Sequence, residues 1–237
     1  MAGREAASSG NSVGISFDGG QFHFQGRDGH TFGIPIVGHV NLTDRVALNY
    51  DIPLQYVEIP GSSFFETGVI LSFPIQVITP SQDHRWSWEV TPTAAFASTG
   101  SKEIMGAGAL TNIISYRWRD ITLTYGNYLS FFEGETLVSN DPEFPKGTSQ
   151  QIMKNGLKVT IPFGKGWLCD VYAIYTNFFQ SAAVSSYYTI GAELGRHLTM
   201  TYAGQALDLG YYSIGLYTEQ GNHYSSGHIQ IGSAWRF

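Results

Sequence analysis

Apolar and polar residues alternate with a period of two along almost the whole of this 237-residue chain. In residues 45–56, one face carries a continuous apolar set: Val46, Leu48, Tyr50, Ile52, Leu54 and Tyr56. The residues between them are mostly small or polar, as Asn49 and Asp51 illustrate. A period of two places alternate side chains on opposite faces of a β-strand, and no segment shows convincing helical spacing. The chain is therefore predicted to be all-β.

About twelve segments show this strand pattern. They lie near residues 11–18, 31–40, 45–56, 64–78, 86–98, 105–116, 121–132, 151–162, 167–178, 186–195, 197–206 and 226–237. The stretch Tyr211–Thr218 is also strand-like, and we expect it in a hairpin or a long loop before the last strand. We expect a single domain over residues 11–237, preceded by a disordered tail at residues 1–10.

The chain carries few charges without being strongly apolar. Charged residues make up 14% of the sequence, against about 25% in an ordinary soluble domain, yet the mean hydropathy is -0.08. Strands with one face toward lipid and the other toward a polar lumen would produce both values. A soluble all-β domain is the alternative, but its outer surface would be richer in Lys and Glu.

The composition also argues against several classes of protein. No run of about 18 apolar residues is present, so we expect no transmembrane helix. The net charge of -6 and the lack of a basic cluster argue against a nucleic-acid partner. The single cysteine, Cys169, excludes an intrachain disulfide framework, and the histidines are scattered, so we expect no metal and no cofactor.

The connections between the segments alternate in length. The short ones are Asn41–Asp44, Arg117–Asp120, Gly164–Gly166 and Gly195–Arg196. The longer ones run near residues 19–30, 57–63, 99–104, 133–150, 179–185 and 207–225. Outer-membrane barrels have an even number of strands, with short turns at one end and longer loops at the other. We therefore predict a transmembrane antiparallel up-and-down β-barrel of about twelve strands, with ten or fourteen as alternatives.

The tryptophans support this prediction, because all five lie beside short turns or near the C-terminus. They are Trp86, Trp88, Trp118, Trp167 and Trp235. Membrane barrels carry aromatic girdles at the lipid–water interfaces, so we expect these residues to form one membrane-interface girdle. Phe and Tyr residues gather at the opposite strand ends, as in Phe178-Phe179 and Tyr187-Tyr188.

The last residues carry a more specific pattern. Gln230 is followed by Gly232 and then by two aromatic residues, Trp235 and the terminal Phe237. This pattern resembles the β-signal that outer-membrane barrels present to the barrel-assembly machinery. It implies that machinery as a partner, together with outer-membrane lipids and lipopolysaccharide. We expect the outer membrane of a Gram-negative bacterium, in a mature or recombinant form without its signal peptide, since residues 1–10 contain no apolar core.

A family resemblance rests on a hairpin and on recurring prolines. Gly38–Leu48, followed by Asp51–Leu54, is similar to the hairpin of the phenol-degradation meta-pathway "transporter" family of outer-membrane channels. Proline recurs within strand segments, at Pro35, Pro53, Pro74 and Pro162, where it can mark bulges. The resemblance implies an outer-membrane channel or export pore whose substrate the family does not fix.

The alternation also predicts which residues line the lumen. The expected pore-lining residues are Arg45, Asn49, Asp51, Glu66, Gln76, Glu89, Lys154, Lys158, Asp170, Glu193 and Arg236. Charges of both signs can tune the selectivity of a wet pore, or they can pair into a closed plug. A barrel of this size lies between filled eight-stranded barrels and open sixteen-stranded porins. We therefore favour a narrow, mixed-charge channel that passes small solutes or export substrates.

Two other functions compete with a channel. His223 and Ser225 resemble the base and nucleophile of outer-membrane lipid hydrolases, with Glu219 or Glu193 as the acid that would orient the base. We do not expect an enzyme, however, because a polar loop can contain such a pair by chance. A structural or adhesive barrel could act through the 133–150 and 207–225 loops. The sequence leaves a monomer and a homotrimer equally open.

Overall fold

A computed structural model describes residues 11–79, 85–99, 103–133, 149–164, 166–179, 184–202 and 205–236. The expected tail at residues 1–10 and the terminal Phe237 lie outside these ranges. The fold is built from strands, as the alternation predicted. In chain order they are β1 (Ser12–Phe24), β2 (Arg27–Gly33), β3 (Ile36–Asn41), β4 (Ala47–Ile52), β5 (Leu54–Ile59), β6 (Ser62–Ser72), β7 (Ile75–Ile78), β8 (Trp86–Thr99), β9 (Glu103–Trp118), β10 (Ile121–Glu133), β11 (Ser149–Phe163), β12 (Trp167–Phe178), β13 (Ser186–Tyr202), β14 (Gln205–Gly221) and β15 (Tyr224–Arg236).

These fifteen segments make twelve barrel strands, because three strands are each interrupted near a proline. The pairs are β2 with β3 at Pro35, β4 with β5 at Pro53, and β6 with β7 at Pro74. Proline has no backbone N–H to donate to a neighbouring strand. The wall continues across the breaks, since the Ile34 amide donates to the Leu54 carbonyl at 2.8 Å. The predicted count of about twelve is confirmed.

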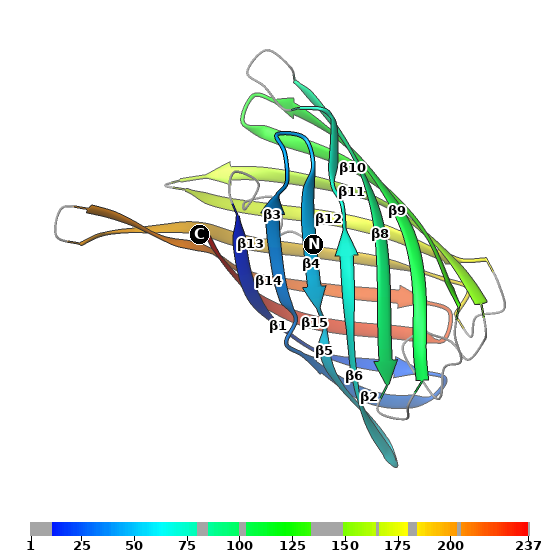
Figure 1. Cartoon of the computed structure of the whole chain (residues 1–237). Helices are drawn as coiled ribbons and strands as arrows, with labels where there is room; N and C mark the ends of the chain where they lie inside the picture. The colour runs from blue at the N-terminus through cyan, green and yellow to red at the C-terminus, as the bar shows by residue number, and fades with distance from the viewer. Residues whose placement is uncertain are drawn as a thin grey trace.

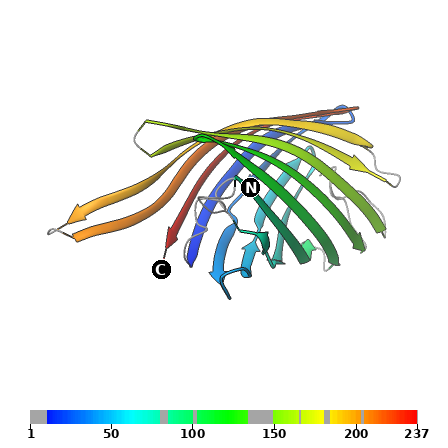
Figure 2. The same cartoon turned by 90° about the horizontal axis from the view of Figure 1, so that it is seen from above.

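The sheet closes on itself through its first and last strands (Figures 1 and 2). β1 pairs antiparallel with β15 along its full length, from Ser12 opposite Arg236 to Phe24 opposite Tyr224. Every other neighbouring pair is also antiparallel, and consecutive barrel strands are neighbours. The predicted up-and-down antiparallel β-barrel is therefore confirmed. No helix in the described ranges is long and apolar enough to cross a membrane.

The two faces of the wall differ sharply in chemistry. In β13, Tyr188 and Ile190 are 60% and 59% exposed, whereas Thr189 and Glu193 are only 8% and 7% exposed. The exposed set is the outward face, because the barrel interior shields the alternate residues. Along the other strands, large apolar side chains likewise recur at outward positions, while most carboxylates occupy inward ones. The outside is thus apolar and the inside polar over most of the wall.

Three of the predicted longer connections are wrong. Residues 19–30, 57–63 and 207–225 contain only the two-residue turns Gln25-Gly26, Pro60-Gly61 and Asn222-His223. The strands on both sides extend up to each turn, and positive φ angles at Gln25, Gly26 and Gly61 allow the tight reversals. The adhesive alternative therefore loses the 207–225 loop, and most of its other loop, residues 133–150, lies outside the described part of the chain.

The segments near residues 186–195 and 197–206 are also not separate strands. Gly195 and Arg196, predicted as a turn, pair with Leu168 and Trp167 inside the continuous strand β13. The twelfth barrel strand comes instead from β14, which includes the stretch that we expected in a hairpin or loop. β13 and β14 have 17 residues each, and their hairpin extends past the neighbouring strands in Figure 1.

The barrel has two distinguishable ends. One end, here called the termini end, carries the start of β1 at Ser12 and the end of β15 at Arg236. All five tryptophans lie near this end: Trp86, Trp88, Trp118, Trp167 and Trp235. Trp86 and Trp118 face outward and are 55% and 50% exposed. The opposite end, here called the distal end, carries the turns after β1, β5 and β14.

Candidate channel lumen

Most of the predicted pore-lining residues occupy inward positions. On β4, Asn49 Oδ1 lies 2.6 Å from His39 Nδ1, within hydrogen-bond distance. Asp51 lies two residues further along β4, on the same face. Arg45 is the exception. It lies exposed in the turn between β3 and β4, so it sits at the rim and not on the wall. Arg236 ends β15 opposite Ser12, and its side chain lies outside the described part of the structure.

Strands β5 to β8 contribute one hydrogen-bonded carboxylate near the termini end and a second carboxylate toward the distal end. Gln76 and Glu89 are cross-strand neighbours, and the Gln76 amide donates to the Glu89 carboxylate. The Thr91 hydroxyl also donates to Glu89, at 3.0 Å. Glu66 lies further toward the distal end, opposite Gln55, with a buried oxygen that accepts no hydrogen bond. Charged and amide groups that were predicted separately thus share one side of the interior.

The predicted lysines lie on β11, beside the carboxylates of β12 and β13. Lys158 Nζ is 3.7 Å from Asp170 Oδ2, and both side chains are well shielded. Asp170 pairs across the strands with Glu193, so two buried carboxyl groups lie side by side. Lys154 Nζ lies 5.8 Å from the centre of the Tyr128 ring, which provides a cation–π contact. The interior therefore combines charges of both signs, as the alternation predicted.

A polar cluster that sequence reasoning missed joins the first and last strands. Asp18 on β1 accepts a hydrogen bond from the Tyr217 hydroxyl at 3.1 Å, and its other oxygen lies 3.2 Å from His228 Nδ1. The Tyr217 and His228 rings stack with centroids 4.5 Å apart. Gly20 makes room for this cluster, since a Cβ there would lie 2.3 Å from His228 Nδ1. Asp18 pairs in register with Gln230, so only barrel closure brings these groups together.

A second missed cluster centres on Glu219 of β14. Its Oε2 accepts hydrogen bonds from the Tyr224 hydroxyl at 2.5 Å and from the Ser226 hydroxyl at 2.8 Å. Thr189 on β13 donates to Oε1 at 3.3 Å. This carboxylate is held by three hydroxyl groups from the two neighbouring strands, β13 and β15, all on the inner face. The sequence pattern suggests Glu219 only as the acid of a hydrolase.

The inward position of Glu219 also argues against the hydrolase alternative. His223 lies in the exposed turn between β14 and β15, with φ of 62°. Ser225 has the outward parity, because its neighbours Tyr224 and Ser226 are the ones that bond to Glu219 inside. Both proposed acids, Glu219 and Glu193, therefore lie on the face of the wall opposite to the Ser225 hydroxyl. The carboxylates and the serine are therefore not brought together on one face of the wall.

The interior changes character toward the distal end. Apolar side chains from six strands, and one from just before β13, form a single packed cluster, here called the apolar ring: Phe22, Val57, Ile59, Ile152, Phe178, Val184, Tyr187 and Tyr224. Val184 and Tyr187 are only 1% and 2% exposed. Phe24, Phe64 and Ala107 pack against the ring from β1, β6 and β9. The interior at this end is therefore occupied by packed apolar side chains.

The paired aromatics at the distal strand ends divide between the two faces of the wall. The sequence pattern places them at the strand ends opposite the tryptophans and assigns no face to either member. In Phe178-Phe179 the first ring is 5% exposed and the second 53%, and Tyr187-Tyr188 divides in the same way. Successive residues of a strand point to opposite faces. One side chain of each pair therefore belongs to the apolar ring. The doubled aromatics were the sequence signal that could have revealed this cluster.

The predicted assembly signal lies on β15 next to the closure. Gln230 and Gly232 pair with Asp18 and Ser16, and Trp235 pairs with Val13. The Ser233 hydroxyl, between them, donates to the Ile15 carbonyl at 3.0 Å. The segment therefore lies in the last strand of the chain, which closes the barrel by pairing with β1.

Comparison with known proteins gives relatives in structure and not in sequence. No family model matches the chain, and no curated protein matches it in sequence. An outer membrane channel from Pseudomonas putida F1 superposes with a TM-score of 0.62 at 9% identity, covering 95% of this chain and 96% of that chain. The NanC porin superposes with a TM-score of 0.59 at 8% identity, over 94% and 100% of the two chains.

The fold is shared beyond channels. The beta domain of the Bordetella autotransporter BrkA superposes with a TM-score of 0.62 at 12% identity, covering 97% of this chain and all of that chain. The fold of this chain is therefore that of bacterial outer-membrane β-barrels. At these identities the likeness concerns the fold alone, so the argument for function rests on the lumen.

Proposed function

We propose that this protein is an outer-membrane channel that passes small solutes through a narrow lumen of mixed charge. The observation that carries the proposal is the closed barrel with an apolar outside and charged groups on its inner wall. A soluble protein exposes polar side chains to water and buries apolar ones, whereas a barrel in lipid requires an apolar outside. The channel and porin among the structural relatives support the same class of function.

The outward face supports placement in a bilayer. Large apolar residues such as Leu216, Leu157 and Phe96 are 59–64% exposed on it. The tryptophans near the termini end would form the girdle at one interface, where their indole rings favour the headgroup region. In this arrangement the distal end faces outward from the cell and the termini lie in the periplasm. Outer-membrane lipids and lipopolysaccharide would then surround the wall.

The inner wall favours cations over anions. The carboxylates at its inward positions are Asp18, Asp51, Glu66, Glu89, Asp170, Glu193 and Glu219. The mid-wall amines that balance them are Lys154 and Lys158, both on β11. Rings of acidic side chains raise the local concentration of cations in a pore. We infer a channel for small neutral or cationic solutes.

The apolar ring sets the permeability. Hydrophobic constrictions restrict passage because water and ions leave a narrow apolar pore easily. Solutes would meet the ring first and the carboxylates second when they enter from outside. The ring therefore limits the size of the solute, and the carboxylates below it set the preference for charge.

Ion selectivity tests this proposal. Under a tenfold KCl gradient across a planar bilayer, we expect a reversal potential with the sign of cation preference. The double variant Asp18→Asn and Glu219→Gln keeps side-chain size but removes two charges, so its reversal potential should move toward zero. A channel that prefers anions, or a variant with an unchanged potential, would contradict the assignment of the lumen charges.

A further inference from the structure

The outward face of β9, β10 and β11 interrupts the apolar belt with a row of amides. Asn112, Asn127 and Asn155 are direct cross-strand neighbours, so they form one line across three strands. All three have the outward parity, since they alternate with inward residues such as Thr124 and Lys154. On the opposite side of the wall such residues would belong to the lumen, but here they face the bilayer.

The row lies deep in the expected membrane band. Asn112 and Asn127 are each six residues from the strand ends at Trp118 and Ile121. At about 3.3 Å per residue and a tilt of about 40°, this distance places them roughly 15 Å above the tryptophan end. That height is near the middle of an apolar band about 25 Å tall. Amides at this depth are costly unless their polar atoms find partners.

The chain satisfies only part of this hydrogen-bonding capacity. The Asn127 amide donates to Asn155 Oδ1 at 2.8 Å, and the Tyr125 hydroxyl donates to the same oxygen at 3.0 Å. Trp88 Nε1 donates to Asn112 Oδ1 at 2.5 Å. Three Asn side chains offer six N–H groups. Within the described part of the chain one of the six has a protein acceptor, and the Oδ1 of Asn127 accepts no hydrogen bond.

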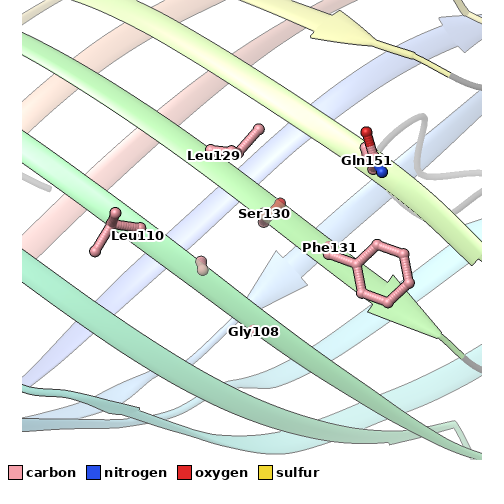
Figure 3. A pocket seen from close by; sticks show the side chains of 7 residues that line it. Gly108, Leu110, Leu129, Ser130, Phe131 and Gln151 are labelled. Atoms are coloured by element: carbon pink, nitrogen blue, oxygen red, sulfur yellow. The ribbon is translucent and has the colours of Figure 1, made fainter.

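An apolar hollow lies on the same face, on the distal side of the row. Its volume is about 270 Å³, and its lining includes Gly108, Leu110, Leu129, Phe131 and Gln151 (Figure 3). Phe131 pairs across the strands with Gly108, and its ring is 47% exposed. The same surface thus presents a projecting ring and a hollow next to it.

We propose that this surface, the outward face of β9 to β11, is the contact between two copies of this chain in the membrane. An amide is both donor and acceptor, so a row of amides can pair with the same row on a second copy. The ring and the hollow are likewise complementary to themselves under a two-fold axis, which is the geometry of an isologous dimer. Lipid tails offer no hydrogen bonds, and headgroups do not reach this depth. A second barrel is therefore the occupant that satisfies both features.

Cross-linking in native outer membranes tests the contact. In a Cys169→Ser background, the variant Leu129→Cys keeps all three amides and should form a disulfide-linked dimer on oxidation with copper phenanthroline. Phe17→Cys is the matched control, because Phe17 also faces outward but lies on β1, six strands around the twelve-strand barrel from β10. Equal cross-linking of the two variants, or none with Leu129→Cys, would overturn the proposal.

A second variant separates dimerisation from folding. The triple change Asn112→Leu, Asn127→Leu and Asn155→Leu removes amides from the lipid-facing surface, so the barrel should fold and keep its heat-modifiable migration. We expect mild-detergent light scattering to give a dimer for the unmodified chain and a monomer for the triple variant. A monomer in the unmodified chain, or a dimer that survives the triple change, would refute the inference. Neither outcome depends on the channel proposal.

Discussion

At the scale of single residues, the lumen is organised by which atoms can approach one another across adjacent strands. Asp18 and Glu219 are held by hydroxyl and imidazole groups from neighbouring strands. Their positions depend on pairings between β1, β13, β14 and β15. Sequence alternation predicted inward positions for carboxylates such as Asp170 and Glu193, but it included neither Asp18 nor Glu219 among the lumen residues. It could not predict that Asp18 meets Tyr217, because 199 positions separate them in the chain.

Close packing at one glycine gives a residue-scale prediction. A Cβ at Gly68 on β6 would lie 2.6 Å from the carbonyl oxygen of Phe96, so Gly68→Ala forces the backbones apart. We expect a loss of roughly 1–3 kcal/mol in the free energy of unfolding. Gly126→Ala is the control, because a Cβ there meets nothing within 4 Å. Urea titrations of the folded barrel in detergent would measure both. Equal stability of the two variants would contradict the packing.

At the scale of elements, the strand pattern was predictable and the turns were not. The period of two identified nearly all barrel strands, including those that break at Pro35, Pro53 and Pro74. It failed near residues 19–30 and 207–225, where glycines and polar residues look like loops but lie within paired strands. A glycine in a barrel strand can leave room for a side chain of a neighbouring strand, as Gly20 does for His228. Composition alone cannot distinguish that use from a turn.

Insertion of a short epitope tests the corrected elements. An insertion after Leu216 interrupts β14, whose residues pair with both β13 and β15, so it should abolish the folded, heat-modifiable form. An insertion after Asn222 enlarges only the exposed distal turn and should leave folding intact. Gel mobility with and without heating distinguishes the two. Normal folding after the Leu216 insertion would restore the loop interpretation.

At the scale of the whole molecule, the barrel combines an apolar outer surface, a charged inner wall and an apolar ring across one end. The first two follow from alternation, and the sequence predicted both. The ring arises because inward apolar side chains from six strands converge at the distal end, which requires closure and strand tilt. A sequence pattern specifies the face of each residue, but closure of the barrel determines which inward residues contact one another.

The most direct test of the channel is single-channel recording in planar bilayers, comparing the unmodified protein with the double variant Ile152→Ser and Phe178→Ser. These side chains are 4% and 5% exposed within the apolar ring, so shortening them should widen the lumen at the ring. We predict discrete current steps for the unmodified protein and larger steps for the variant. Correctly folded barrels that remain silent in both forms would contradict the proposed channel.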